Sequence, residues 1–103
     1  MRDLILRYAR ASEPMRHLCR LLLERPDGIT NEDIAAKIGI DNGSGYIGRL
    51  SRRWKIDLER DWFCSIAFTE TGQRSTRLRI YRLTDDGADR LERAIVSCES
   101  IGL

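Results

Sequence analysis

Residues 29–40 read ITNEDIAAKIGI, and this stretch carries a complete local signature for a short helix. Thr30 followed three residues later by Asp33 resembles a capping box, in which each side chain hydrogen-bonds the backbone N–H of the other residue. The apolar face consists of Ile34, Ala35 and Ile38. Gly39 is a typical residue to end a helix in the left-handed conformation. The pattern therefore predicts a helix that opens at Thr30 and ends at Gly39.

Downstream, a turn cluster at residues 41–44 opens another helix, which we expect to run to about Lys55 with Asp41 or Ser44 as its N-cap. The residues at core-facing helical spacing are Ile47, Leu50 and Trp54. The opposite face carries Gly45, Gly48, Arg49 and Arg52. Because a glycine costs about 1 kcal/mol in a helix interior, this face indicates a surface that something approaches closely. The alternative is a frayed helix start.

Upstream, the pattern predicts a helix from about Ser12 to Arg25, with Ser12 as N-cap and Pro14 in the first turn. Its buried stripe consists of Met15, Leu18, Cys19 and Leu22. Residues 1–10 fit either a strand or one helical turn. Their apolar content indicates that they pack on something, which could be a second subunit.

Two strand-like segments follow at residues 62–69 and 77–83, where apolar residues recur with the period of a strand. The polar residues 70–76 between them fit a hairpin tip. The last helix opens at Thr84, which acidic residues follow as they commonly do at a helix start. Its apolar stripe consists of Ala88, Leu91, Ala94, Ile95 and Cys98.

The chain of 103 residues is expected to form a single domain. Within it, residues 1–12 form an N-terminal arm and residues 84–100 form the C-terminal helix. The expected order is three helices, two strands and a helix, and the class is α+β. The predicted core consists of Leu18, Leu22, Ile34, Ile38, Ile47, Leu50, Trp54, Ile66, Phe68, Leu83 and Leu91.

Two of these segments carry a resemblance. With a small residue at Ala35 and a turn glycine at Gly39, residues 29–40 resemble the first half of a bacterial helix-turn-helix. Residues 81–87, YRLTDDG, with Leu91 after them, look like the signature that closes the wing in winged-helix regulators of the MarR and PadR types. The resemblance implies a winged helix-turn-helix fold and DNA binding. The turn between the two helices is about two residues longer than in the shortest helix-turn-helix.

The distribution of charge is an independent argument. The formal net charge is only +2, but residues 44–55 and 71–84 hold four basic residues each and no acidic residue. In a winged helix these segments are the recognition helix and the wing, and DNA affinity rests largely on neutralising phosphates with Arg and Lys. The alternative is that both basic segments are ordinary solvated surface.

The expected DNA-binding residues divide by role. Arg49 and Arg52 lie one turn apart and are the candidates for base contact, because arginine reads guanine bidentately in the major groove. The candidates for phosphate or minor-groove contact are Arg53, Lys55, Arg74 and Arg77. The turn and smooth face that complete the site are Asn42, Ser44, Gly45 and Gly48.

No catalytic constellation is expected, since the single histidine, His17, has no nucleophile and acid arranged with it. The spacing of Gly43, Gly45 and Gly48 spells a nucleotide-binding pattern, but it follows a helix and not a strand. Cys19, Cys64 and Cys98 are too far apart to suggest a metal site. We therefore expect no enzyme activity, no cofactor, no metal and no intrachain disulfide under reducing conditions.

No apolar run approaches the length of a membrane span, and the expected location is the cytoplasm. The expected function is sequence-specific binding of double-stranded DNA by a small prokaryotic, phage or mobile-element transcriptional regulator. A homodimer on paired half-sites is expected, formed by residues 4–6 and by the last helix with Leu91, Ile95 and Cys98. The alternatives are a winged-helix protein-protein interaction module and an RNA-binding or replication-associated winged helix.

Overall fold

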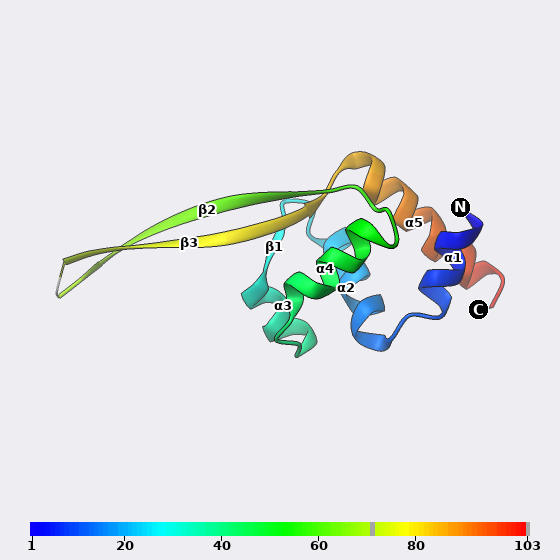
Figure 1. Ribbon diagram of the computed structural model, residues 1–103, viewed down its shortest axis with the longest axis horizontal. Coiled ribbons are helices and arrows are strands. Elements are labelled where there is room, and N and C mark those ends of the chain that lie inside the picture. Colours follow the sequence, from blue (N-terminus) through cyan, green and yellow to red (C-terminus); the bar gives the residue numbers. More distant parts are fainter. Residues whose placement is uncertain (71, 103) are drawn as a thin grey trace.

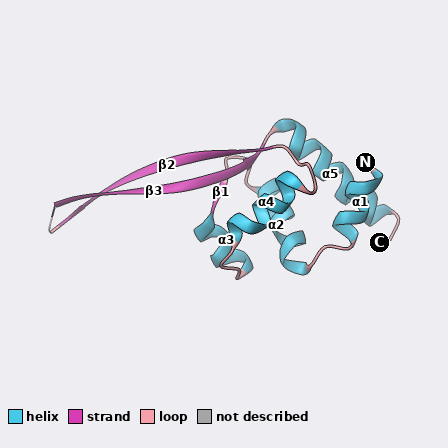
Figure 2. Ribbon diagram, viewed as in Figure 1, coloured by secondary structure: helices cyan, strands magenta, loops and turns pink. Residues whose placement is uncertain are grey.

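The computed structural model describes residues 1–70 and 72–102, with the backbone but not the side chains of residues 63–69 and 74–77. The elements are α1 (Arg2–Ala9), α2 (Glu13–Glu24), β1 (Ile29–Thr30), α3 (Asn31–Ile38), α4 (Gly43–Arg52), β2 (Leu58–Thr69), β3 (Gly72–Leu83) and α5 (Asp85–Ser100). The described chain thus has five helices and a three-stranded antiparallel sheet (Figure 2). It is α+β, as expected, and this order is compatible with a winged helix.

Three of the helices begin where the sequence predicts. Ser12 caps α2 by accepting a hydrogen bond from the backbone N–H of Met15. Thr30 and Asp33 form the expected capping box at α3, with N···O distances of 3.0 and 3.1 Å. Thr84 caps α5. A cap satisfies backbone N–H groups that have no partner inside the helix, so these local signals position the helix starts.

The start and end of α4 differ from the prediction. Its N-cap is Asn42, whose side-chain oxygen accepts from the Gly45 N–H at 3.2 Å, and not Asp41 or Ser44. The helix ends at Arg52, before Lys55, which has a left-handed φ of 55°. The Lys55 carbonyl accepts a hydrogen bond of 2.7 Å from the Arg90 guanidinium on α5. A tertiary contact therefore holds the chain just after the helix.

The N-terminal arm is the helix α1, and it packs against α5. Leu4 and Tyr8 are buried in this contact. The dimer expected through the chain ends stays a prediction, although several of the apolar residues on which it rests pack inside one chain. Those buried within the chain are Leu4, Leu91, Ile95 and Cys98.

The hairpin is longer than predicted. β2 and β3 pair continuously from Leu58 opposite Leu83 to Thr69 opposite Gly72. Residues 72–76, expected to be loop, belong to β3, so the prediction of a hairpin tip over residues 70–76 was wrong. Polar composition marked these residues as loop, but cross-strand hydrogen bonding, which composition does not report, holds them in the strand.

The third strand, β1, was not expected, because two residues are too few to show an alternating pattern. Ile29 pairs with Tyr81 and Thr30 with Ile80, which gives the sheet order β1-β3-β2. β1 therefore supports only the base of the hairpin. The rest projects from the helical body, and both chain ends lie at the opposite end of a molecule measuring 57 × 25 × 21 Å (Figure 1).

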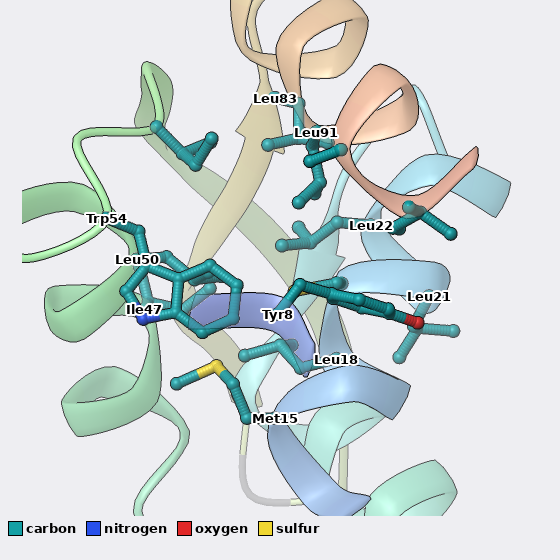
Figure 3. Close-up of a cluster of buried hydrophobic side chains, with 14 of the residues drawn as sticks. Tyr8, Met15, Leu18, Leu21, Leu22, Ile47, Leu50, Trp54, Leu83 and Leu91 are labelled. Atoms are coloured by element: carbon teal, nitrogen blue, oxygen red, sulfur yellow. The ribbon is translucent and has the colours of Figure 1, made fainter. Parts of the chain in front are cut away.

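The core lies where the helices meet the base of the sheet (Figure 3). The predicted core residues that are buried are Leu18, Leu22, Ile34, Ile47, Leu50, Trp54, Leu83 and Leu91. Ile38 is only partly buried. The side chains of Ile66 and Phe68 lie outside the described part of the structure. The apolar face of α4, with Ile47 and Leu50, therefore packs inward and its other face stays free.

None of the described helices has the length and hydropathy needed to span a bilayer. Among the described residues, no cluster of three or more His, Cys, Asp or Glu side chains is arranged to hold a metal ion. Cys19 and Cys98 are both buried. The side chain of Cys64 is outside the described part of the chain.

Candidate nucleic-acid interface

A side chain at each of the three glycines of α4 would meet different surroundings. A Cβ on Gly43 would lie 2.9 Å from the Asn31 side chain and 3.0 Å from that of Ile34, so Gly43 lets α4 approach α3. A Cβ on Gly45 would collide with the capping side chain of Asn42 at 2.4 Å. Gly48 has open space around its Cα, with only the end of the Arg52 side chain at 4.0 Å. Of these three positions, Gly48 is the one at which packing within the chain does not require a glycine, so its lack of a side chain leaves the helix surface smooth.

The exposed face of α4 is hollowed and basic. A hollow of about 190 Å³ is lined by Ser44, Gly45, Gly48, Arg49, Arg52 and Arg53. The Arg49 guanidinium lies over the Tyr46 ring, 5.1 Å from its centroid, which restricts this long side chain through a cation–π contact. The structure thus brings six of the predicted site residues together on one helix face.

A second hollow, of about 530 Å³, lies between α4 and the base of the hairpin. Its lining consists of Asn42, Ser44, Gly45, Gly48, Ser51, Arg52, Arg60, Arg79 and Tyr81. Arg60 on β2 and Arg79 on β3 thus join the basic face of α4. Neither residue stands out in the sequence as part of this site, because the face on which they lie follows from the pairing of β2 with β3. The groove runs from the helix onto the sheet.

The pairing register explains this arrangement. Arg60 lies opposite Tyr81, and Trp62 lies opposite Arg79. Directly paired residues point to the same side of a sheet, and so do residues two apart on a strand. These four positions therefore share the face that looks toward α4. The Arg79 guanidinium lies over the Trp62 ring at 4.7 Å, and Trp62 is 53% exposed.

On the opposite face of the hairpin base, acidic side chains of the same chain neutralise the arginine charge. The Arg82 guanidinium is 2.8 Å from a Glu59 carboxylate oxygen and also contacts Asp61. The hydrogen bond with Glu59, and then the charge of Asp61, raise the pKa of Arg82 above its usual value. Arg82 is therefore paired inside the chain, although the sequence counts it with the wing arginines.

The remaining arginines of this surface have no such partner. Among the residues that the structure describes, no carboxylate lies within salt-bridge distance of Arg49, Arg52, Arg53, Arg60 or Arg79. Unlike the paired side of the hairpin, this surface has positive charge available for an external anion. Lys55 is exposed but lies beyond the end of α4, outside both hollows.

The side chains of the two predicted wing residues, Arg74 and Arg77, lie outside the described part of the structure. Their backbone belongs to β3, with Arg77 opposite Cys64 and Arg74 opposite Ala67. By the alternation of a strand, position 77 falls on the face of Arg79 and position 74 on the other. Both are therefore strand positions, on two different faces, and position 74 belongs to β3 although it was expected in the hairpin tip.

Comparison of the chain with protein-family models, with curated proteins and with solved structures found no match in any of the three.

Proposed function

We propose that this chain is a winged helix-turn-helix protein that binds double-stranded DNA in a sequence-specific manner. The observation that carries the proposal is the row of arginines, without a carboxylate partner among the described residues, that runs from α4 across the groove to the hairpin base. Positive charge without a carboxylate partner is the footprint of a phosphate-binding surface. We extend the proposal to a small prokaryotic, phage or mobile-element transcriptional regulator in the cytoplasm, on the resemblance of residues 29–40 and 81–91.

In this proposal α4 enters the major groove, which is wide enough for one α-helix. Arg49 and Arg52 lie on the exposed face of α4 and would reach the edges of the bases. The open position at Gly48 between them and the helix start allows the helix backbone to approach the DNA closely. Ser44, near the N-terminus of α4, is placed to contact a base or a phosphate.

The hairpin base would hold the phosphate backbone beside that groove. Arg60 and Arg79 lie across the hollow from Arg52 and have no acidic partner among the described residues, so they suit phosphate oxygens. Arg53 follows on the α4 side, and position 77 continues the same face of β3 outward. Arg82 has no role here, because Glu59 and Asp61 already neutralise it.

The test separates two kinds of arginine by fluorescence anisotropy on a selected duplex and on a random duplex, each at low and physiological salt. Arg49→Ala or Arg52→Ala is expected to cost about 1–3 kcal/mol on the selected duplex and to relax specificity there. Arg60→Ala or Arg79→Ala is expected to weaken binding to both duplexes alike. Each is also expected to reduce the slope of log affinity against log salt concentration by about one unit. Arg74→Ala and Arg77→Ala are expected to have the same two effects, as phosphate contacts do.

Arg16→Ala is the matched control, since Arg16 lies on α2, pairs with Glu13 at 3.0 Å and lines neither hollow of the interface. Its DNA affinity is expected to equal that of the wild type. If no substitution on α4 or the hairpin base lowers affinity more than this control does, the chain does not use this surface for DNA.

A second candidate is the protein-interaction module. The observation that favours it is the exposed Trp62 on a projecting hairpin whose β2 sequence, WFCSIAF over residues 62–68, is mostly apolar. Aromatic residues are enriched in the centre of protein interfaces. A chain that binds no duplex, yet loses a protein partner on Trp62→Ala, would support this function over the first.

The homodimer also stays a proposal, on a different surface from the one expected. Met1 and Val96 are each at least 50% exposed and line a shallow hollow on the outer side of α5. We propose that a second copy covers them, since paired half-sites suit a dimer. Sedimentation with and without DNA tests this, and Val96→Glu is expected to shift the protein to monomer. A wild-type protein that is monomeric in both conditions would contradict it.

A further inference from the structure

Another hollow lies at the edge of the hairpin base, where β1 ends and α3 begins. β1 pairs with only two residues of β3, and among the described residues no strand covers that edge of β3 further out. The start of α3 lies beside the open edge (Figure 1). The hollow has a volume of about 400 Å³, and its lining includes Glu32 from α3 and Trp62 and Arg79 from the hairpin.

Trp62 presents an aromatic surface in this hollow, since the residue is 53% exposed. The Arg79 guanidinium lies over its ring, 4.7 Å from the centroid. This cation–π contact occupies one part of the indole and restricts both side chains. The part of the indole that stays exposed is a platform on which a flat group can stack. A base stacked on an aromatic ring beside basic residues is the usual way in which proteins hold single-stranded nucleic acid.

The charges in the hollow are of both signs and do not neutralise each other. Arg79 also lines the hollow beside α4, so the two hollows form one continuous surface. Glu32 is exposed, and among the described residues no basic side chain lies within salt-bridge distance of it. A carboxylate repels a polyanion. Glu32 therefore suits a nucleic acid only where it accepts hydrogen bonds from a base.

We propose that this hollow binds an unpaired guanine of DNA, with the base stacked on Trp62, its base-pairing edge at Glu32 and its phosphate at Arg79. Guanine presents a ring N–H and an amino group side by side on that edge, and one carboxylate accepts from both. Adenine and cytosine each place an acceptor beside their amino group. The site deepens the proposed function, on which only its position next to a duplex rests.

The first experiment measures the affinity of the full chain for short labelled strands of abasic deoxynucleotides that carry a single guanine, a single adenine or no base. All three strands have the same charge. The guanine strand is expected to bind about tenfold more tightly than the strand without a base, on the scale of one base stacked on an aromatic ring. Trp62→Ala is expected to abolish this gain, and Trp62→Phe to keep most of it. Thermal midpoints verify that both variants are folded.

Glu32→Gln separates hydrogen bonding from charge. Loss of the negative charge is expected to strengthen binding of all three strands, whereas the preference for guanine over adenine is expected to fall. Glu24→Gln is the matched control, because Glu24 is an exposed glutamate on α2 that does not line the hollow. It removes the same charge and is expected to keep the preference for guanine.

Four results of the first experiment overturn the proposal. The wild type binds the guanine strand no better than the strand without a base, or Trp62→Ala keeps the gain. Glu24→Gln loses the preference for guanine as far as Glu32→Gln does. A ribonucleotide strand with one guanine binds more tightly than the deoxyribonucleotide strand, which would assign the hollow to RNA.

The second experiment compares a fully paired duplex with the same duplex carrying one extrahelical guanine or one extrahelical abasic nucleotide. The wild type is expected to bind the guanine duplex most tightly, and Trp62→Ala is expected not to distinguish guanine from the abasic nucleotide. A preference for guanine on the strand but not in the duplex would overturn the position beside the duplex. If the wild type binds no duplex, the first experiment still decides the hollow and the proposed function fails alone. If it binds the paired duplex but never prefers guanine to the abasic nucleotide, the guanine site fails alone.

Discussion

In the helical body Leu18, Ile34 and Ile47 have no exposed surface, whereas Trp62 on the hairpin exposes 53% of its area. The apolar side chains of the helical body are buried together in one core. The hairpin beyond β1 has two strands and no layer of helices over it (Figure 1). A two-stranded ribbon is only marginally stable by itself in water. The comparison teaches that a closed core supports α4, whereas the projecting part of the hairpin depends on the pairing of β2 with β3.

The largest effect that this comparison predicts is on the free energy of unfolding. Leu18→Ala is expected to cost about 2–5 kcal/mol, because it leaves a cavity in a closed core. Trp62→Ala is expected to cost less than about 1 kcal/mol, the range of one cross-strand pair. Urea denaturation of both variants measures the difference. Equal losses would mean that Trp62 belongs to the folding core, and the comparison would break.

The second prediction concerns the junction of body and hairpin. A Cβ on Gly87 of α5 would lie 2.0 Å from the Asp57 carbonyl oxygen, just before β2. Both sides of this contact are backbone, and neither can move alone. Gly87→Ala is expected to destabilise the chain by about 1–3 kcal/mol, as overpacking does. A urea midpoint unchanged from the wild type would show that the junction is looser than the structure has it.

The third prediction uses a titrating group inside the body. Burial raises the pKa of the Cys19 thiol from 9.0 to about 12. Because the pKa is higher in the folded state than in the unfolded state, this group's contribution to stability is complete below about pH 9. It is lost as the pH rises toward about 12. Between pH 9 and pH 10.5 the loss is about 1–2 kcal/mol.

The check for the third prediction is the slope of the unfolding free energy against pH. Cys19→Ala is expected to flatten that slope over the same range, whatever it does to stability at neutral pH. Identical slopes for the variant and the wild type would rule out Cys19 as the cause of alkaline destabilisation.

The smallest expected effect separates stability from binding within α4. Gly48 has open space where a Cβ would go, so Gly48→Ala is expected to stabilise the helix by about 0.5–1 kcal/mol. The same methyl group lies on the surface proposed to face DNA, so duplex affinity is expected to fall. A variant with higher stability and unchanged affinity would remove Gly48 from the proposed interface. Thermal melts and anisotropy on one preparation test both outcomes.

Signals that act within a few residues were readable from the sequence. The caps at Ser12, Thr30 and Thr84 and the left-handed glycine at Gly39 satisfy the ends of their own helices, so no distant partner is needed to place them. The periodicity of α4 also identified its inner and outer faces, because the apolar residues of a helix repeat on one side. Together with the strand-like alternation of residues 62–69 and 77–83, these signals were enough to predict the α+β class and the basic face of α4.

The features that depend on contacts between residues far apart in the sequence were decided only by the tertiary structure. The length of the hairpin and the faces of Arg60, Arg79 and Arg82 follow from the register of β2 on β3, which connects residues about twenty positions apart. Arg82 looks like any other wing arginine until that register brings Glu59 and Asp61 to it. The packing of α1 on α5 brings the two ends of the chain together. Composition and periodicity describe one element at a time, and the contacts between elements are fixed only when the core closes.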